Sequence, residues 1–261
     1  MKSAAIEAAA DLLWGMWRDG LRADELPAAI RPATREEGYA IQALVERHTA
    51  KMRFGWKIAA TSSAGQAHIN VDRPLAGRLL AENVFASGAR LPFGANHMRV
   101  AEAEFAFRMG RDLPPQASQY ERAEILEAVE ALHPAIEIPD SRYNDFTKVG
   151  APQLIADNGC AHLFVLGPAA SATWRSIDLI GHPVRAANGA LRHDGNGGRV
   201  LGDPLVALTW LANELSSLGI TLNRGEVVTT GTCVTPLPIA PGDEVVADFG
   251  SLGELTVRLA S

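Results

Sequence analysis

Several groups that mark common functional classes are scarce in this sequence. The 261 residues include only two cysteines, Cys160 and Cys233, and no Cys-x-x-Cys pair. This excludes a disulfide scaffold and a zinc knuckle, and it favours a reducing compartment. The formal net charge is -6 with no basic run, so nucleic-acid binding is not expected. No run of about 18 apolar residues occurs, and we predict no membrane span.

The motifs of several enzyme classes are missing as well. There is no Gly-x-Ser-x-Gly, no P-loop and no Gly-x-Gly-x-x-Gly. Their absence argues against serine acyl transfer, nucleotide phosphate binding and dinucleotide binding. Glu7 and Asp11 interrupt the apolar N-terminal stretch, which therefore does not fit a signal peptide. We expect a cytoplasmic globular protein, whose core the 47% of hydrophobic residues can supply.

Helical periodicity of apolar residues predicts four helices. Thr34, followed by Glu37 three residues later, fits a capping box, and Asp203-Pro204 fits an N-cap followed by proline in the first turn. Pro134 is expected to end the third helix. The helices are predicted over residues 6–20, 34–51, 120–132 and 204–218.

Strands and glycine-rich turns dominate after residue 53 and do not alternate regularly with helices. Strands are predicted over residues 54–58, 102–107, 135–138, 163–167, 226–230, 244–249 and 255–259. The stretch 188–200 is rich in glycine and asparagine and predicts a mobile loop or a hairpin. This pattern indicates an α+β fold with a mixed sheet. We predict a helical N-terminal part over residues 1–52 and one catalytic domain over residues 53–261.

Three glutamates on apolar segments are the most informative feature. Glu102 and Glu104 stand one residue apart, and Glu137 lies between two isoleucines. In a strand, residues i and i+2 point to the same face, so Glu102 and Glu104 project side by side. A hard divalent cation that prefers oxygen ligands, Mg²⁺ or Mn²⁺, would neutralise such a cluster. The alternative is that these glutamates lie on the solvent face of amphipathic strands.

Lys57 is the second candidate functional residue, because it stands between apolar residues in a predicted strand. Lysine is seldom buried without a partner. Beside carboxylates and a metal, its amine could donate or accept a proton, and burial and carboxylates shift its pKa in opposite directions. The alternative is a surface lysine on an edge strand.

Taken together, these segments resemble one family, the 2-keto-4-pentenoate hydratase/2-oxo-3-hexenedioate decarboxylase group of the fumarylacetoacetate hydrolase superfamily. The resemblance runs in order from about residue 34 to the C-terminus. Each motif is weak by itself, but the ordered set is specific. The matching segments are Gly55-Trp-Lys-Ile58 with Thr61-Ser62, Glu102-Ala-Glu104, 134–143, Ala156-Asp-Asn158, Leu201-Gly-Asp-Pro204, Trp210-Leu-Ala-Asn213, 225–231 and Pro241-Gly-Asp243.

The resemblance implies a mixed β-roll or barrel-like core, a homo-oligomer and a small 2-oxo acid substrate from the catabolism of aromatic-type compounds. It implies Mg²⁺ or Mn²⁺ held by Glu102, Glu104 and Glu137, and it makes Lys57 the active-site lysine. It also implies substrate-binding positions, which fall on Asn158, Thr230 and Thr232.

Departures from the family pattern leave three functions open. Leu75 occupies a position where hydratases of the family often carry an aspartate, Cys160 stands where a serine is frequent, and Arg99 is shifted by one from a basic position now held by Val100. The leading prediction is a metal-dependent hydratase of a 2-hydroxy-dienoate or 2-oxo-enoate. The second, motivated by Leu75, is a decarboxylase of a 2-oxo-enedioate, with Arg73 as a guess for the second carboxylate. The third is a non-catalytic protein that binds a 2-oxo acid.

Overall fold

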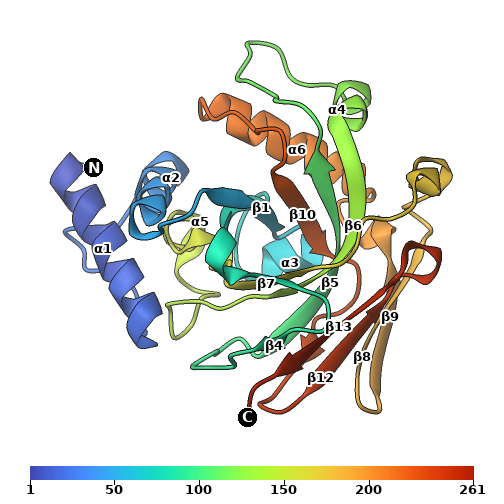
Figure 1. Cartoon of the computed structure of the whole chain (residues 1–261). Helices are drawn as coiled ribbons and strands as arrows, with labels where there is room; N and C mark the ends of the chain where they lie inside the picture. The colour runs from blue at the N-terminus through green and yellow to red at the C-terminus, as the bar shows by residue number, and fades with distance from the viewer.

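Two β-sheets form the centre of the structure, a computed structural model that describes all 261 residues (Figure 1). The larger sheet has eight strands in the order β2-β1-β10-β5-β6-β7-β3, with β11 paired to β5. The smaller sheet has five strands in the order β4-β13-β12-β8-β9. The larger sheet consists of β1 (Arg53–Ala59), β2 (Leu75–Leu80), β3 (Val84–Ala86), β5 (Val100–Met109), β6 (Val129–Ile138), β7 (Leu163–Leu166), β10 (Val227–Thr232) and β11 (Leu237–Pro238). The smaller sheet consists of β4 (Arg90–Leu91), β8 (Pro183–Asn188), β9 (Leu191–Asn196), β12 (Glu244–Asp248) and β13 (Glu254–Leu259).

The larger sheet combines parallel and antiparallel neighbours and curls into a half-barrel (Figure 1). β1 and β10 run parallel, whereas β5 runs antiparallel to both of its neighbours, β10 and β6. α2 (Arg35–Ala43) packs against α5 (Gly150–Ala156), and α4 (Arg122–Ala128) packs against α6 (Pro204–Ser217). The expected α+β class with a mixed, roll-like sheet is confirmed.

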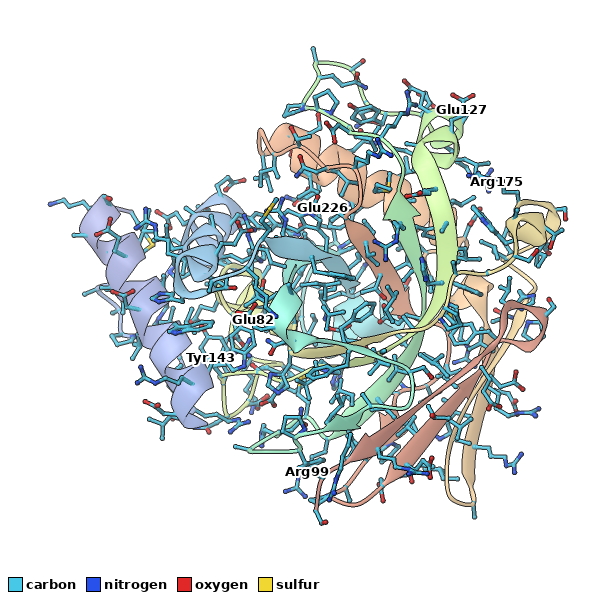
Figure 2. All side chains as sticks on the ribbon, viewed as in Figure 1. Glu82, Arg99, Glu127, Tyr143, Arg175 and Glu226 are labelled. Carbon is cyan, nitrogen blue, oxygen red and sulfur yellow. The ribbon has the colours of Figure 1, made fainter.

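Six α-helices surround the sheets, and none combines the length and the apolar character that a bilayer crossing requires. α1 packs on α2 through a small apolar cluster that also contains Tyr143, which Figure 2 shows beside α1. This cluster ties the N-terminal helices to the segment after β6. The division of the chain at residue 52 stays a prediction. The helices are α1 (Ser3–Asp19), α2 (Arg35–Ala43), α3 (Ser63–His68), α4 (Arg122–Ala128), α5 (Gly150–Ala156) and α6 (Pro204–Ser217).

The predicted start of α6 is confirmed, because the Asp203 side chain accepts a hydrogen bond from the Leu205 amide at 2.8 Å. The cap of α2 is confirmed in part. Thr34 accepts from the Glu37 amide, but the Glu37 carboxylate bonds the amide of Ala33 and not that of Thr34. After Ala43 the chain tightens into a 3₁₀ helix over Leu44–His48, so the helical run ends before residue 51.

The helix expected over residues 120–132 is wrong in its last four residues. α4 ends at Ala128, and Val129 begins β6, which continues through Pro134. Pro134 fits this strand because its main-chain oxygen accepts from Gly167, just beyond the end of β7. The nitrogen of Pro134 points to the same side of β6 as this oxygen. The pairing of β6 with β7 ends at Ala135, so no β7 residue requires a hydrogen bond from an N–H at position 134. The apolar residues at helical spacing serve equally well in a strand that is buried on both faces.

The turn-rich stretch 188–200, predicted to be either a mobile loop or a hairpin, contains the β8–β9 hairpin turn. β8 and β9 pair from Pro183↔Asn196 to Asn188↔Leu191, which leaves a two-residue connection. Gly189 adopts φ 58 there, the left-handed backbone that such tight hairpin turns require.

The main apolar core lies between the two sheets. Phe105 of β5 is fully buried, and its ring meets that of Phe249 edge-on at 5.3 Å. Because side chains alternate along a strand, Phe105 points to the face of β5 opposite to that of Glu102 and Glu104. The aromatic core on one face therefore fixes which face receives the carboxylates.

This packing predicts that Phe105→Ala destabilises the protein by about 3–5 kcal/mol, since it removes a fully buried aromatic side chain and leaves a cavity. Urea unfolding followed by circular dichroism measures the change. Phe85→Ala is the matched control, because Phe85 is only partly buried, and it should cost clearly less. Equal losses for the two variants would contradict the assignment of Phe105 to the central core.

Candidate metal centre and active site

The carboxylates of Glu102, Glu104 and Glu137 converge on one point of the larger sheet. Glu102 on β5 pairs directly with Glu137 on the antiparallel strand β6, and Glu104 follows two residues later on the same face. One oxygen from each side chain lies within 4.8 Å of the others. Glu104 and Glu137 are buried and Glu102 is partly exposed. The structure therefore brings together the three residues that the sequence suggested as ligands.

Lys57 lies against this cluster from the other side of β10. Its Nζ is 2.9 Å from Glu137 Oε1, an ion-pair distance, and donates a hydrogen bond of 2.9 Å to the main-chain oxygen of Gly159. Only 3% of Lys57 is exposed, which rules out the surface alternative. Burial lowers the pKa of Lys57, but Glu137 and Glu102 outweigh burial and hold that pKa above its usual value.

The strand that carries Lys57 is fixed by its opposite face. Trp56 is fully buried, with the guanidinium carbon of Arg53 4.4 Å from its ring centroid and that of Arg78 4.7 Å away. Glu46 accepts from both arginines, at 2.6 and 2.8 Å. These stacking and ion-pair contacts, to which Glu226 adds a pair with Arg53 at 2.7 Å, hold β1 in place, and alternation then directs Lys57 toward the carboxylates.

Burial makes the carboxylates resist ionisation. Burial, followed by the charge of Glu137, raises the pKa of Glu102 to about 7, against a partial opposing effect of Lys57. Burial and the other two carboxylates hold the pKa of Glu104 well above its usual range. Burial also raises the pKa of Glu137, although Lys57 opposes the change. One ammonium group therefore does not neutralise three carboxylates.

The oxygens left without hydrogen bonds match a cation site. Glu104 Oε2 accepts from the Thr229 hydroxyl and from the Gly231 amide at 2.8 Å, but Oε1 of Glu104 accepts nothing. Oε2 of Glu137 has no hydrogen-bond donor, and Oε1 has only the ion pair with Lys57. Buried carboxylate oxygens without donors are costly, and an all-oxygen donor set suits a hard divalent cation. The residues present therefore fit a metal ion held by the three glutamates.

The expected substrate-binding residues lie close by, but the polar side-chain atoms of all three are hydrogen-bonded to main chain, Thr232 through its hydroxyl to the main-chain oxygen of Val234 at 2.9 Å. The Asn158 amide bonds both main-chain groups of Arg78, and the Thr230 hydroxyl donates to the main-chain oxygen of Phe105 at 3.0 Å. Thr232, which is partly exposed, pairs with Glu104 across the strands. The roles of Asn158, Thr230 and Thr232 in binding substrate stay predictions.

Two contacts of the cluster were missed by sequence reasoning. Thr229 and Gly231 donate hydrogen bonds to Glu104. They flank Thr230 in the sequence and lie at a β-bulge between Thr229 and Thr232. The register shift at a bulge cannot be read from a run of threonines and glycine. These contacts follow from the pairing of β10 with β5, the strand that carries Glu104. That pairing is a feature of the tertiary structure and has no local signal in the sequence.

Leu75, the residue that departs from the family pattern, is fully buried at the start of β2. It pairs with Ala59, two residues from the Lys57↔Gly77 pair, so its side chain lies on the same face of the sheet as that of Lys57. Arg73 instead lies half exposed and pairs with Asp72 at 3.5 Å. The neighbourhood of Lys57 on β2 is therefore apolar.

A cavity of about 520 Å³ lies beside α1, away from the carboxylates. Its polar side chains are largely paired with one another. Arg22 binds Asp140 at 2.8 Å, and Trp17 donates to His162 at 3.0 Å. We assign no function to this cavity.

The chain belongs to the fumarylacetoacetate hydrolase family. The family's sequence profile, described as the fumarylacetoacetate (FAA) hydrolase C-terminal domain, matches residues 58–260. The match begins at the residue after Lys57 and covers all three glutamates.

Individual relatives and solved structures agree with this membership. The chain is 32% identical over 258 residues to 2-keto-4-pentenoate hydratase 1 of Dechloromonas aromatica, covering 97% of each protein. It is 33% identical over 208 residues to 2-hydroxyhexa-2,4-dienoate hydratase of Comamonas testosteroni, covering 78% of this chain and 77% of the relative. The fold superposes with a TM-score of 0.90 on 4-oxalocrotonate decarboxylase from Pseudomonas putida G7 complexed with magnesium and adipate. That alignment is 24% identical and covers 99% and 98% of the two chains.

The raised carboxylate pKa values predict how stability depends on pH without metal. The folded protein holds a proton on Glu102 up to about pH 7, whereas the unfolded chain releases it near the usual value of 4.5. Stability should therefore fall as pH rises through this window, by up to about 1.4 kcal/mol per pH unit. Thermal unfolding of chelator-treated protein between pH 4.5 and 7 measures the decline.

Saturating MgCl₂ should restore the melting temperature, and the gain should grow with pH because the cation competes with protons for the carboxylates. Glu137→Gln is the control, since it removes one ligand and one of the repelling charges and should flatten both trends. A wild-type melting temperature that changes with neither pH nor Mg²⁺ would contradict the metal site.

Proposed function

We propose that this protein is a metal-dependent lyase that adds water to a 2-hydroxy-dienoate or 2-oxo-enoate such as 2-keto-4-pentenoate. The observation that carries the proposal is the convergence of three carboxylate oxygens within 4.8 Å, beside the buried amine of Lys57. The names of the relatives, which are 2-keto-4-pentenoate and 2-hydroxyhexa-2,4-dienoate hydratases, support the same reaction.

Glu102, Glu104 and Glu137 would hold Mg²⁺ or Mn²⁺. Both ions favour octahedral oxygen coordination, and three carboxylates leave about three positions for a substrate and water. A cation bound there supplies Lewis-acid polarisation of the keto oxygen of a 2-oxo acid. Glu102 is the partly exposed member of the set, so a substrate would reach the cation beside this residue.

Lys57 supplies the proton chemistry in this proposal. Its pKa lies above its usual value, so Nζ carries a proton at neutral pH and can donate it to the substrate or hold a negatively charged substrate oxygen. The ion pair with Glu137 and the bond to Gly159 keep Nζ at the edge of the carboxylate cluster. Thr232 is the predicted substrate-binding residue that retains partial exposure.

Decarboxylation of a 2-oxo-enedioate is the second candidate. Leu75 favours it, because this leucine takes the position of a carboxylic acid on the face of the sheet that carries Lys57. Without an acid at that position, one proton carrier for the addition of water is missing. The 4-oxalocrotonate decarboxylase fold is shared as well, although at 24% identity it supports only the fold.

Two further expectations, that the chain assembles as a homo-oligomer and that it resides in the cytoplasm, stay predictions. They do not enter the reaction proposed here.

The metal ligands and Lys57 should have separable roles in metal binding and turnover. Glu104→Gln should weaken Mn²⁺ binding by on the order of 100-fold or more, because it replaces the unbonded oxygen of a metal ligand. Lys57→Met should bind Mn²⁺ at least as tightly as the wild type, since it removes a nearby positive charge, yet lower kcat by about 10²–10⁴-fold. Calorimetric titration with Mn²⁺ and the loss of dienoate ultraviolet absorbance measure the two effects.

Asp194→Asn, in the exposed β8–β9 hairpin, is the control and should leave both values unchanged. The proposal fails if wild-type protein saturated with Mg²⁺ or Mn²⁺ leaves the absorbance of the dienoate unchanged. Metal-dependent binding of a 2-oxo acid without any product would instead indicate the non-catalytic binding protein.

Of the two candidate reactions, only decarboxylation releases CO₂. The wild type should consume 2-keto-4-pentenoate and yield the hydrated 2-oxo acid, while 2-oxo-3-hexenedioate should release no CO₂. Proton NMR of the product and a coupled CO₂ assay measure the two reactions side by side. Release of CO₂ from the dicarboxylic substrate together with an inert monocarboxylic one would transfer the assignment to the decarboxylase.

A further inference from the structure

A left-handed turn lies directly beneath Lys57. Asn158, Gly159 and Cys160 have φ values of 57, 58 and 61, a backbone region that residues other than glycine seldom adopt. All three are buried. Consecutive residues persist in such a conformation only when the surrounding structure holds them there, and such strain concentrates at functional sites.

The turn presents a main-chain oxygen to the active-site lysine. Gly159 O accepts the hydrogen bond of Lys57 Nζ at 2.9 Å, while Glu137 lies 2.9 Å from the same nitrogen. An ammonium group has three donors, and one hydrogen bond to Gly159 O together with the ion pair to Glu137, on different elements, defines where Nζ sits. Without Gly159 O, the ammonium would be drawn further into the three carboxylates.

One side of the turn is held by a buried ion pair. Asp157, the residue before the turn, pairs with the Arg142 guanidinium, and both side chains are almost fully buried. Arg142 also donates through Nη2 to the main-chain oxygen of Asp157 at 2.6 Å. The Asp157 carboxylate accepts in addition from the Ser141 hydroxyl at 2.7 Å and from the Arg142 amide at 3.0 Å. Side-chain and main-chain atoms of Asp157 are therefore both fixed.

The other side of the turn is held by β2. The Asn158 side chain accepts from the Arg78 amide at 2.6 Å and donates to the Arg78 main-chain oxygen at 2.9 Å. Gly77 makes this approach possible, since a Cβ there would lie 2.3 Å from Asn158 O and 3.0 Å from Lys57 Cγ. The turn and the lysine thus pack over the same glycine.

We propose that Arg142 and Asp157 are positioning residues that set the place of Lys57 Nζ through the main-chain oxygen of Gly159. The inference rests on the proposed lyase function, in which Lys57 handles the proton. Neither residue touches the carboxylate cluster through a hydrogen bond or an ion pair. Their effect should therefore fall on turnover and not on metal binding.

The test is Asp157→Asn, which keeps the size of the side chain but removes its charge and turns one of its two acceptor oxygens into a donor. We expect kcat to fall by about 10²-fold, as for a catalytic group displaced by about 1 Å, with KM and Mn²⁺ affinity nearly unchanged. Hydrogen exchange of the Cys160 and Ala161 amides, which bond within this turn, should accelerate. Asp194→Asn, which breaks an exposed Arg–Asp pair of 2.7 Å, is the matched control and should change none of these.

The decisive arm combines Asp157→Asn with Lys57→Met. If Asp157 acts through Lys57, adding Asp157→Asn to Lys57→Met should cause no further loss of residual turnover. Losses that multiply would overturn the inference, and so would an unchanged kcat in a variant whose turn exchanges faster. Should Asp157→Asn alone fail to fold because Arg142 is left unpaired, the double variant Arg142→Gln/Asp157→Asn removes both buried charges and takes its place in each comparison.

Exchange rates and Mn²⁺ affinity do not depend on turnover. If the wild type proves inactive on every dienoate, the proposed function fails while the role of the ion pair in holding the turn remains measurable. Exchange at Cys160 and Ala161 that matches the wild type would overturn the structural part of the inference.

Discussion

Repulsion among three clustered carboxylates, two of them buried, is the constraint on which the rest of the structure depends. Glu102, Glu104 and Glu137 place acceptor oxygens within 4.8 Å of one another, and Lys57 contributes a single positive charge beside them. With three carboxylates ionised and one ammonium present, a divalent cation brings the group to neutrality. Without a cation, protonation of the carboxylates would relieve the repulsion, and the pKa of Glu102 is raised accordingly, to about 7. The scaffold must therefore be stable enough to hold like charges together.

In the scaffold, one face of β5 and of β1 packs into the apolar core while the other face of the same strand carries the ionisable groups. On β5, Phe105 packs into the core between the sheets while its neighbours carry the carboxylates. On β1, Trp56 packs against the guanidinium groups of two arginines while the side chain of Lys57 points toward the carboxylate cluster. Strand alternation makes the two faces inseparable, because a shift of register by one residue would exchange apolar and ionisable side chains. Core packing therefore also sets the geometry of the site.

Local signals in the sequence predicted those parts that depend on near neighbours. The glutamate spacing, the Asp203 cap of α6 and the tight β8–β9 hairpin follow from two- to four-residue patterns. The helix expected over residues 120–132 failed because an apolar run serves a buried strand as well as a helix. Whether Pro134 ends a helix or occupies a strand depends on where β7 ends, which no local pattern contains.

The sequence by itself determined the identity and facing of the carboxylates, the strand that bears Lys57 and the family to which the chain belongs, because strand periodicity and ordered motifs are properties of the chain. Tertiary structure alone decided that Glu137 pairs with Glu102, that Thr229 and Gly231 hold Glu104, and that Gly159 receives Lys57. These contacts join segments from 35 to more than 100 residues apart. Their distances are set by strand register, a bulge and a left-handed turn, and those features exist only when the whole sheet has assembled.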